Sequence, residues 1–155
     1  MTMIEMETGE YLNTLCPLLE QGKLVDVPVA GNSMYPFLEH GRDTVYLERP
    51  EAPLRRGDVV LFRRRSGQFV LHRIVRCENG SFWITGDAQQ NPEGPIAQEQ
   101  IAGIVTCVMR DGKQLKPGDR RWEFYARTWV RLVPVRHIVL RLLRIRKKER
   151  KKSSE

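Results

Sequence analysis

Three residues of the chain, Ser33, His72 and Asp87, are of types that together could cleave a peptide bond. Ser33 stands in the segment GNSMYPFLEHGRD, where Gly31 permits a close backbone approach and Pro36 fixes the chain just after the serine. A serine on such a bend can point its own N–H into a cleft and stabilise an oxyanion there. Taken alone, the segment favours an ordinary polar turn, because isolated Gly-x-Ser patterns are common.

His72 lies in the segment FVLHRIV, whose alternation predicts a strand with Val70, His72 and Ile74 on one face. A histidine with apolar neighbours is often a half-buried structural residue. However, burial also holds an imidazole neutral near pH 7, and a neutral imidazole can act as a general base. His40, in a turn, and His137, in a basic helix, are weaker candidates.

Asp87 ends the segment SFWITGD, fifteen residues after His72 and at the far end of the next predicted strand. Two strands of one hairpin could bring its carboxylate within reach of the imidazole. A carboxylate in that place would orient the histidine and stabilise its charged form. The alternative is a common Gly-Asp turn with no catalytic part.

The elements that must position these residues are mainly short strands. Most of the β-rich runs between residues 24 and 109 are separated by glycine, proline or aspartate, which predicts a compact, mainly antiparallel β domain. The clearest hairpin joins QFVLHRIV to SFWITGD through RCENG. The runs are LVDVPVAG, DTVYLER, GDVVLFRR, QFVLHRIV, SFWITGD and IAGIVTCVM.

Helical patterns flank the β-rich region on both sides. A short helix is predicted over residues 3–22, and a basic amphipathic helix follows Pro134, which can open it. The end of the chain, RKKERKKSSE, is predicted to be a charged and disordered tail. The expected organisation is an N-terminal helix and linker at 1–25, a β domain at 26–118, a C-terminal helical segment at 119–146 and a tail at 147–155.

Charge is concentrated at the C-terminal end of the 155-residue chain. Residues 131–155 hold ten Lys/Arg and two Glu, a net of +8, whereas the formal charge of the whole chain is +7, so the remainder is close to neutral. This distribution argues against a nucleic-acid-binding surface on the β domain, and no nucleic-acid partner is expected. The three cysteines form no CxxC pair, so neither a disulfide framework nor a zinc knuckle is suggested. No metal or other cofactor is expected.

The N-terminal segment MTMIEMETGEYLNTL is acidic and lacks the basic-then-apolar order of a signal peptide. The chain also has no run of about 18 apolar residues, the usual minimum for a membrane-spanning helix. The expectation is a cytoplasmic protein, or one that lies peripherally on a membrane.

Taken in order, GNSMYPFL, GRD, RRGDVVLF, VLHRIV and ITGD resemble the five conserved segments of the signal peptidase I family of serine proteases. The resemblance covers residues 26–110 and extends to the autoproteolytic domains of SOS-type repressors. It implies the fold of those antiparallel β domains, with Ser33 as nucleophile. Most bacterial members use a lysine base, but the matching residue here is His72, as in the endoplasmic-reticulum and archaeal-type branch. Asp87 matches the first aspartate of the last segment, and only Glu93 could replace the second.

The resemblance further implies a serine endopeptidase that cleaves a leader or signal-like peptide after small residues, with the substrate bound as an added strand. Because Gly31 has no hydroxyl, the Ser33 N–H is the expected oxyanion donor. Four residues are candidates for the substrate groove, although core packing explains them equally well. They are Val29, Met34, Tyr35 and Phe37.

The alternative function is a non-catalytic peptide-binding or regulatory module with the same fold. Residues 1–25 are too few for the helix-turn-helix that a repressor would need. Family members that process exported proteins are anchored by a transmembrane helix, which this sequence does not show. Residues 131–152, with an apolar stripe and many basic residues, instead predict a helix on an anionic membrane surface. The sequence is equally consistent with a helix that packs its apolar stripe on the β domain and leaves its charges in water.

Overall fold

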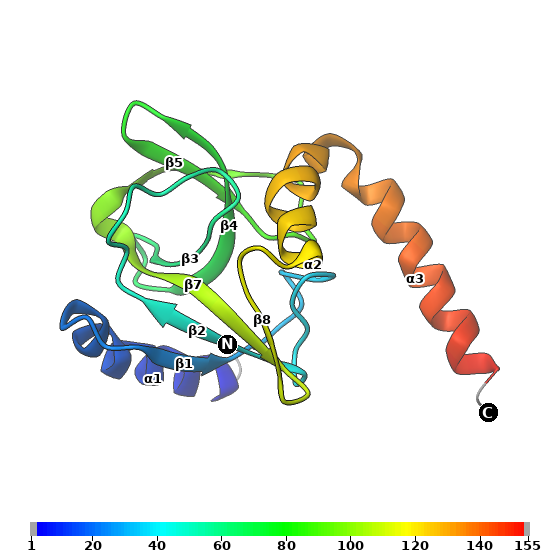
Figure 1. Ribbon diagram of the computed structural model, residues 1–155, viewed down its shortest axis with the longest axis horizontal. Helices are drawn as coiled ribbons and strands as arrows, with labels where there is room; N and C mark the ends of the chain where they lie inside the picture. Colours follow the sequence, from blue (N-terminus) through cyan, green and yellow to red (C-terminus); the bar gives the residue numbers. More distant parts are fainter. Residues whose placement is uncertain (1–2, 154–155) are drawn as a thin grey trace.

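The computed structural model describes the backbone of residues 3–153 and the side chains from residue 9 onward. A mainly antiparallel β sheet lies between an N-terminal and a C-terminal helix (Figure 1). The strands are β1 (Val25–Pro28), β2 (Asp43–Glu48), β3 (Val59–Arg63), β4 (Phe69–Glu78), β5 (Ser81–Thr85), β6 (Glu93–Ala97), β7 (Ile101–Arg110) and β8 (Lys113–Leu115). The helical elements are α1 (Met3–Glu20), η1 (Gln98–Gln100), α2 (Arg120–Glu123), η2 (Phe124–Thr128), η3 (Trp129–Val135) and α3 (Arg136–Lys152).

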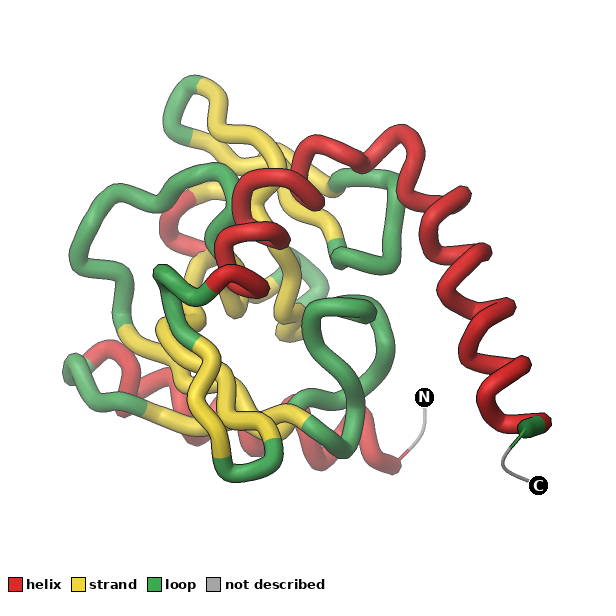
Figure 2. The backbone as a smooth tube through the Cα atoms, turned by 45° about the vertical axis from the view of Figure 1, so that its right-hand side comes forward, coloured by secondary structure: helices red, strands yellow, loops and turns green. Residues whose placement is uncertain are grey.

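The eight strands form one sheet in the order β1-β2-β7-β3-β4-β5-β6, and β8 pairs with β7. All neighbouring strands are antiparallel. The sheet bends strongly, so that its two ends approach each other around the interior (Figure 2). The fold expected from the sequence, a mainly antiparallel β domain with helices at both ends, is confirmed.

The hairpin between β4 and β5 is present as predicted, with Glu78 opposite Ser81. Its turn is formed by Asn79 and Gly80, whose φ angles are 50° and 77°. Two central residues with positive φ are typical of the tight hairpin turn that matches strand twist, and asparagine and glycine adopt this conformation most easily. The turn therefore fixes the register that places His72 and Thr85 on neighbouring strands.

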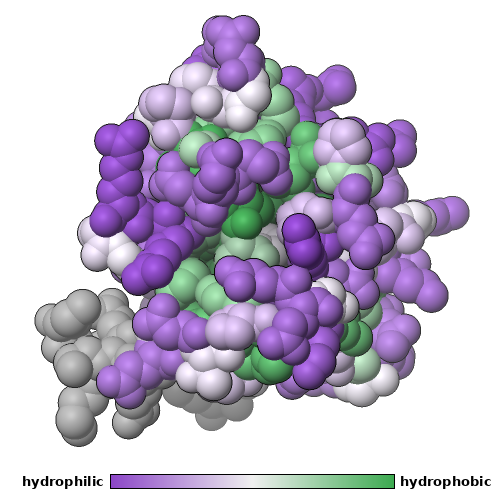
Figure 3. Space-filling view, turned by 90° about the vertical axis from the view of Figure 1, so that its left-hand side faces the viewer, coloured by the Kyte–Doolittle hydropathy of each residue, from purple (hydrophilic) through white to green (hydrophobic). Residues whose placement is uncertain are grey.

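Two buried apolar clusters stabilise the fold, and β3 contributes to both. Val59 and Leu61 belong to the first cluster, whereas Val60 and Phe62 belong to the second, because successive side chains of a strand point to opposite faces. α1 covers the first cluster with Leu12, Leu15 and Leu19, which are buried at the helical spacing seen in the sequence. On the face shown in Figure 3, apolar surface lies mainly in a hollow between hydrophilic side chains.

The C-terminal region differs in detail from the helix predicted after Pro134. Three short helical segments (α2, η2 and η3) precede α3, and Pro134 lies inside the last of them. α3 then continues to Lys152, although the sequence predicted a disordered tail from residue 147. None of the helices within residues 3–153 is long and apolar enough to cross a membrane.

Candidate active site

Ser33 lies in a turn between β1 and β2 that is anchored by buried apolar side chains. The N–H of Tyr35 donates to the carbonyl of Asn32 at 3.2 Å, and that of Leu38 donates to the carbonyl of Met34 at 2.9 Å. Met34 and Leu38 are buried, whereas Ser33 is partly exposed. The turn therefore holds the serine at the surface of the first core cluster.

The ITGD segment holds Ser33 from the other side. The N–H of Ala88 donates to the carbonyl oxygen of Ser33 at 2.9 Å. A Cβ atom at Gly86 would lie 2.4 Å from the same oxygen, so no larger residue fits there without a backbone shift. Glycine at position 86 thus lets the loop after β5 lie directly against the turn that carries Ser33.

Ser33 and His72 line the same cavity, which has a volume of about 340 Å³. Two of the four predicted groove residues, Val29 and Met34, line it as well. Its wall also includes the end of β1 and the first half of β4, among them Val27, Pro28, Val70 and Leu71. The sequence-predicted nucleophile and base therefore face one shared space.

Two strand edges with free backbone groups border this cavity. β1 pairs only with β2, so its other edge has no partner strand within residues 3–153. β4 pairs with β5 only from Arg73 onward, so residues Phe69–His72 have β3 on one side and no strand on the other. An extended peptide can add to such edges through main-chain hydrogen bonds.

His72 is held neutral by its surroundings. Only 3% of the residue is exposed, and its ring lies 6.3 Å from that of Phe62, measured between centroids. Burial lowers the pKa of His72 to about 4, outweighing the nearby charge of Glu93, which raises it. The buried Nδ1 atom has no hydrogen-bond partner within the described chain. The imidazole is therefore a free base at neutral pH.

Glu93, the first residue of β6, is the acidic residue whose carboxylate lies close to His72. Its Oε1 atom is 3.9 Å from His72 Nδ1. Arg64 holds the carboxylate through two hydrogen bonds, from Nε to Oε2 at 2.9 Å and from Nη2 to Oε1 at 2.7 Å. This places a fixed negative charge beside the imidazole, just beyond hydrogen-bond distance.

The structure places Asp87 on Arg73 rather than on His72. Arg73 donates from Nε to Oδ1 and from Nη2 to Oδ2, both at 2.8 Å, and both side chains are almost fully buried. Arg73 follows His72 on β4, so its side chain points to the opposite face. The hydrogen bond from His72 to Asp87 that the sequence suggested is therefore not formed. Asp87 affects His72 only as a nearby charge, which raises the pKa of the histidine.

The C-terminal helical segment binds the same loop, a contact that the sequence did not predict. The indole N–H of Trp129 donates to the carbonyl of Asp87 at 3.0 Å. Arg136, which is fully buried, donates from Nη1 to the carbonyls of Gly86 at 3.0 Å and Gln89 at 3.2 Å, and from Nη2 to that of Trp129 at 3.1 Å. No sequence signal separates this arginine from the exposed ones that follow it.

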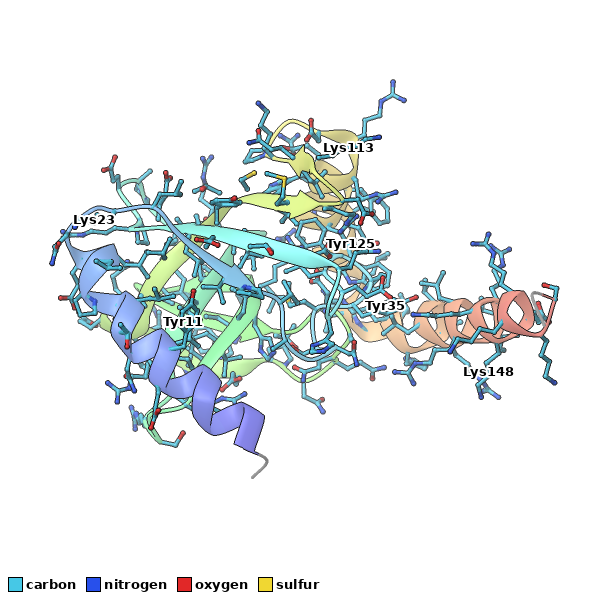
Figure 4. All side chains as sticks on the ribbon, turned by 90° about the horizontal axis from the view of Figure 1, so that it is seen from below. Tyr11, Lys23, Tyr35, Lys113, Tyr125 and Lys148 are labelled. Carbon is cyan, nitrogen blue, oxygen red and sulfur yellow. The ribbon has the colours of Figure 1, made fainter. Side chains whose placement is uncertain are left out.

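The other two predicted groove residues do not line the cavity. Phe37 is buried in the core, where it packs against Trp122 with centroids 5.6 Å apart and under the guanidinium of Arg73 at 4.9 Å. Its core packing follows from its place after the serine turn, on the side where α2 covers the sheet. Tyr35 lies beside α3 (Figure 4) and has the Lys147 ammonium 5.4 Å from its ring centroid.

Among the side chains that the structure describes, from residue 9 to residue 153, no group of three or more histidine, cysteine or acidic residues could hold a metal ion. A family model described as Peptidase S24-like matches residues 2–108. That match covers α1 and the sheet through most of β7, including Ser33, His72 and Asp87, and ends before the C-terminal helical segment. No curated protein of similar sequence is found.

Proposed function

The chain belongs to the Peptidase S24-like family, and on this premise we propose that it is a serine endopeptidase with Ser33 as nucleophile and His72 as general base. The observation that carries the proposal is the shared cavity, in which a buried and neutral imidazole stands with a partly exposed serine. The histidine in place of the usual lysine supports the endoplasmic-reticulum and archaeal-type branch.

In the proposed reaction, Ser33 Oγ attacks the peptide carbonyl while His72 accepts the hydroxyl proton. A hydrogen-bond donor must stabilise the negative charge that develops on the carbonyl oxygen. The proposed donor is the Ser33 N–H, because it has no backbone acceptor of its own within residues 3–153. The protonated His72 then donates to the leaving amine, which departs and leaves an acyl-serine. A water molecule, deprotonated by His72, hydrolyses this ester and regenerates the serine.

The two acidic residues of the site have different proposed parts. Glu93 stabilises the imidazolium, because its carboxylate is the charge that most favours the protonated form of His72. Asp87 acts through the scaffold, because it fixes the loop whose Ala88 N–H binds the Ser33 carbonyl. We therefore propose Glu93, rather than Asp87, as the third member of the catalytic group.

The proposed substrate is an extended peptide that adds as a strand between β1 and the first half of β4. The two free edges support this mode, because each offers unpaired main-chain groups to the cavity. Val29 and Met34 give the cavity an apolar wall. Small residues before the cut, and a leader or signal-like peptide as their source, are carried over from the resemblance to signal peptidases.

The test is cleavage of a soluble peptide library by the full chain, with the products mapped by mass spectrometry. Ser33→Ala and His72→Ala should each reduce cleavage by about a thousand-fold or more, with an unchanged circular dichroism spectrum. The matched controls are His137→Ala, within α3, and Ser153→Ala, at its C-terminal end. Both should cleave as the wild type does. Near-normal activity of either site variant would exclude this mechanism.

The alternative, a module that binds peptides without cutting them, is favoured by one observation. Within the described residues, the buried Nδ1 atom of His72 accepts no hydrogen bond from the Ser33 hydroxyl. Such bonds are often long without substrate and tighten when it binds. Peptides that bind the wild type and the Ser33→Ala variant with equal affinity, and that neither protein cleaves, would identify the binding module.

A further inference from the structure

The first part of α3, up to Ile145, presents an apolar row to solvent, which Glu149 ends one turn further along the same side of the helix. Ile138, Leu142 and Ile145 are all about half exposed or more, with Leu142 at 58%. Their spacing of four and three residues places them on one side of the helix, and Val135 extends the row by one turn. Exposed apolar residues scattered over a surface need no explanation, but a row on one helix face marks an interaction site.

This face is the one turned away from the rest of the protein. Arg136 and Leu140, on the opposite side of the helix, are the residues of α3 that are buried. Beyond them, α3 is attached by the ion pair of Lys147 with Glu39 at 2.9 Å. The remainder of the helix extends away from the sheet, and Lys148 lies far from it (Figure 4). Packing on the β domain, the alternative open from the sequence, therefore does not cover the apolar row.

Basic side chains border the apolar face on both sides. At 100° per residue, Arg141 and Lys148 lie along one border and Arg146 along the other. α3 contains nine Lys/Arg and one Glu, a net of +8, and its acidic residue is Glu149. A narrow apolar stripe between basic borders is the pattern of a helix that lies in the plane of an anionic membrane surface.

We propose that α3 docks the protein on an anionic lipid surface, with Ile138, Leu142 and Ile145 inserted among the acyl chains. A second copy of the chain is a poor occupant, because pairing two such helices would bring two charges of +8 together. Nucleic acid would use the basic residues but not the exposed apolar row. Lipid uses both, since each basic residue near an anionic surface adds roughly five-fold to the affinity.

This docking would also place the catalytic groove near the membrane. Arg136 begins α3 and binds the Gly86 and Gln89 carbonyls of the loop that lies against Ser33. The helix and the nucleophile turn are therefore linked through one buried side chain. The proposal stands without the peptidase function, because it concerns a surface that does not include Ser33 or His72.

The experiment is flotation of the full chain with vesicles of zwitterionic lipid alone and with vesicles containing about one third anionic phosphatidylglycerol. Binding is expected to the anionic vesicles only, and it should weaken as salt rises because the attraction is screened beyond about 8 Å at physiological salt. The double variant Ile138→Ser/Leu142→Ser should lose at least ten-fold in affinity. Leu24→Ser is the matched control, because Leu24 is 54% exposed and its neighbour Lys23 lies at the opposite end of the molecule from α3 (Figure 4), so this change should not affect binding.

Two results would overturn the proposal. The first is equal or absent binding of the wild type to both kinds of vesicle at low salt. The second is undiminished anionic binding by the double serine variant, because a charge-only interaction would assign α3 to nucleic acid or to an acidic protein. Sedimentation of wild type and variant adds a further check, since a wild-type dimer that the variant abolishes would assign the apolar face to a second copy. Cleavage of soluble peptides is expected to be the same in all these variants.

Discussion

His72 and Arg73 are neighbours on β4, yet they belong to two regions with different physical character. On the His72 side, Arg64 and Glu93 form an ion pair in which each side chain is about one third exposed. On the Arg73 side, the pair with Asp87 is almost fully buried, at 1% and 0% exposed. Both are bidentate contacts between arginine and carboxylate, so the residue types alone do not distinguish them.

The difference shows how one strand can serve the chemistry and the scaffold at once. A buried ion pair leaves an uncompensated charge when either partner is lost, so it fixes geometry firmly. A half-exposed pair is screened by water and contributes little to stability, but its charge remains available to a group beside it. The Arg73 side therefore fixes the loop that binds the Ser33 carbonyl, and the carboxylate on the His72 side raises the pKa of the proposed base.

The largest effect is expected on the buried side. Asp87→Asn should lower the free energy of unfolding by about 3–5 kcal/mol, because the Arg73 guanidinium loses its compensating charge in the interior. Urea denaturation monitored by tryptophan fluorescence measures this change. The matched control is Asp26→Asn at an exposed position of β1, which should alter stability by less than about 0.5 kcal/mol. If the Asp87→Asn protein were as stable as the wild type, the buried Arg73–Asp87 pair would contribute no more to stability than the partly exposed Arg64–Glu93 pair.

The next effect concerns Arg136, which binds two carbonyls of the same loop. Arg136→Met keeps most of the side-chain volume but removes the donors to three carbonyls, so a loss of about 2–3 kcal/mol is expected. Because the loop binds the Ser33 carbonyl, kcat should also fall while KM changes little. The exposed Arg141 on the same helix provides the control variant for stability, Arg141→Met. A normal kcat in Arg136→Met would show that the hydrogen bonds of Arg136 do not position Ser33 for the reaction.

The pH dependence tests the His72 side directly. The pKa of His72 is about 4 in the folded protein and near its usual 6.5 when unfolded, so the unfolded state binds more protons between these values. The contribution of the neutral imidazole to the free energy of unfolding is complete above pH 6.5. It is lost as the pH falls toward 4, by up to about 1.4 kcal/mol per pH unit. His72→Gln should remove this dependence. The kcat/KM of the wild type should stay level down to about pH 5 and fall near pH 4.

The smallest effect is expected for Glu93→Gln. Its charge raises the pKa of His72, so its removal should shift the acid limb of kcat/KM to lower pH and reduce the rate by about ten-fold. Stability should change by less than about 1 kcal/mol, because the pair with Arg64 is partly exposed. Glu51→Gln, an exposed loop variant, should show neither change. An unaltered pH profile would assign no role to Glu93 and leave His72 without a carboxylate partner.

Much of the fold, and the two candidate residues that line one cavity, could be predicted from the sequence, because they depend on short-range patterns. Alternation in FVLHRIV places Val70 and Ile74 on one side and Leu71 on the other, and the second core cluster contains Ile74 and contacts Val70. The Asn79-Gly80 turn sets one hairpin by its own dihedral preferences. The order of the segments around Ser33 and His72 predicts the family fold that the match at 2–108 confirms. The more specific branch and substrate remain predictions.

The rest was decided by contacts between residues far apart in the chain. From its position after the hairpin, the Asp87 carboxylate could bind either His72 or Arg73. The packing of its loop against β4 determines that it accepts hydrogen bonds from the buried Arg73. Arg136 is the same residue type as the exposed arginines of α3, yet it is buried because it donates to the carbonyls of Gly86, Gln89 and Trp129. Phe37 became core because α2 covers it. Periodicity and turn chemistry report a residue's local conformation, whereas the partner of a buried charge depends on which distant backbone is left unsatisfied when the chain is folded.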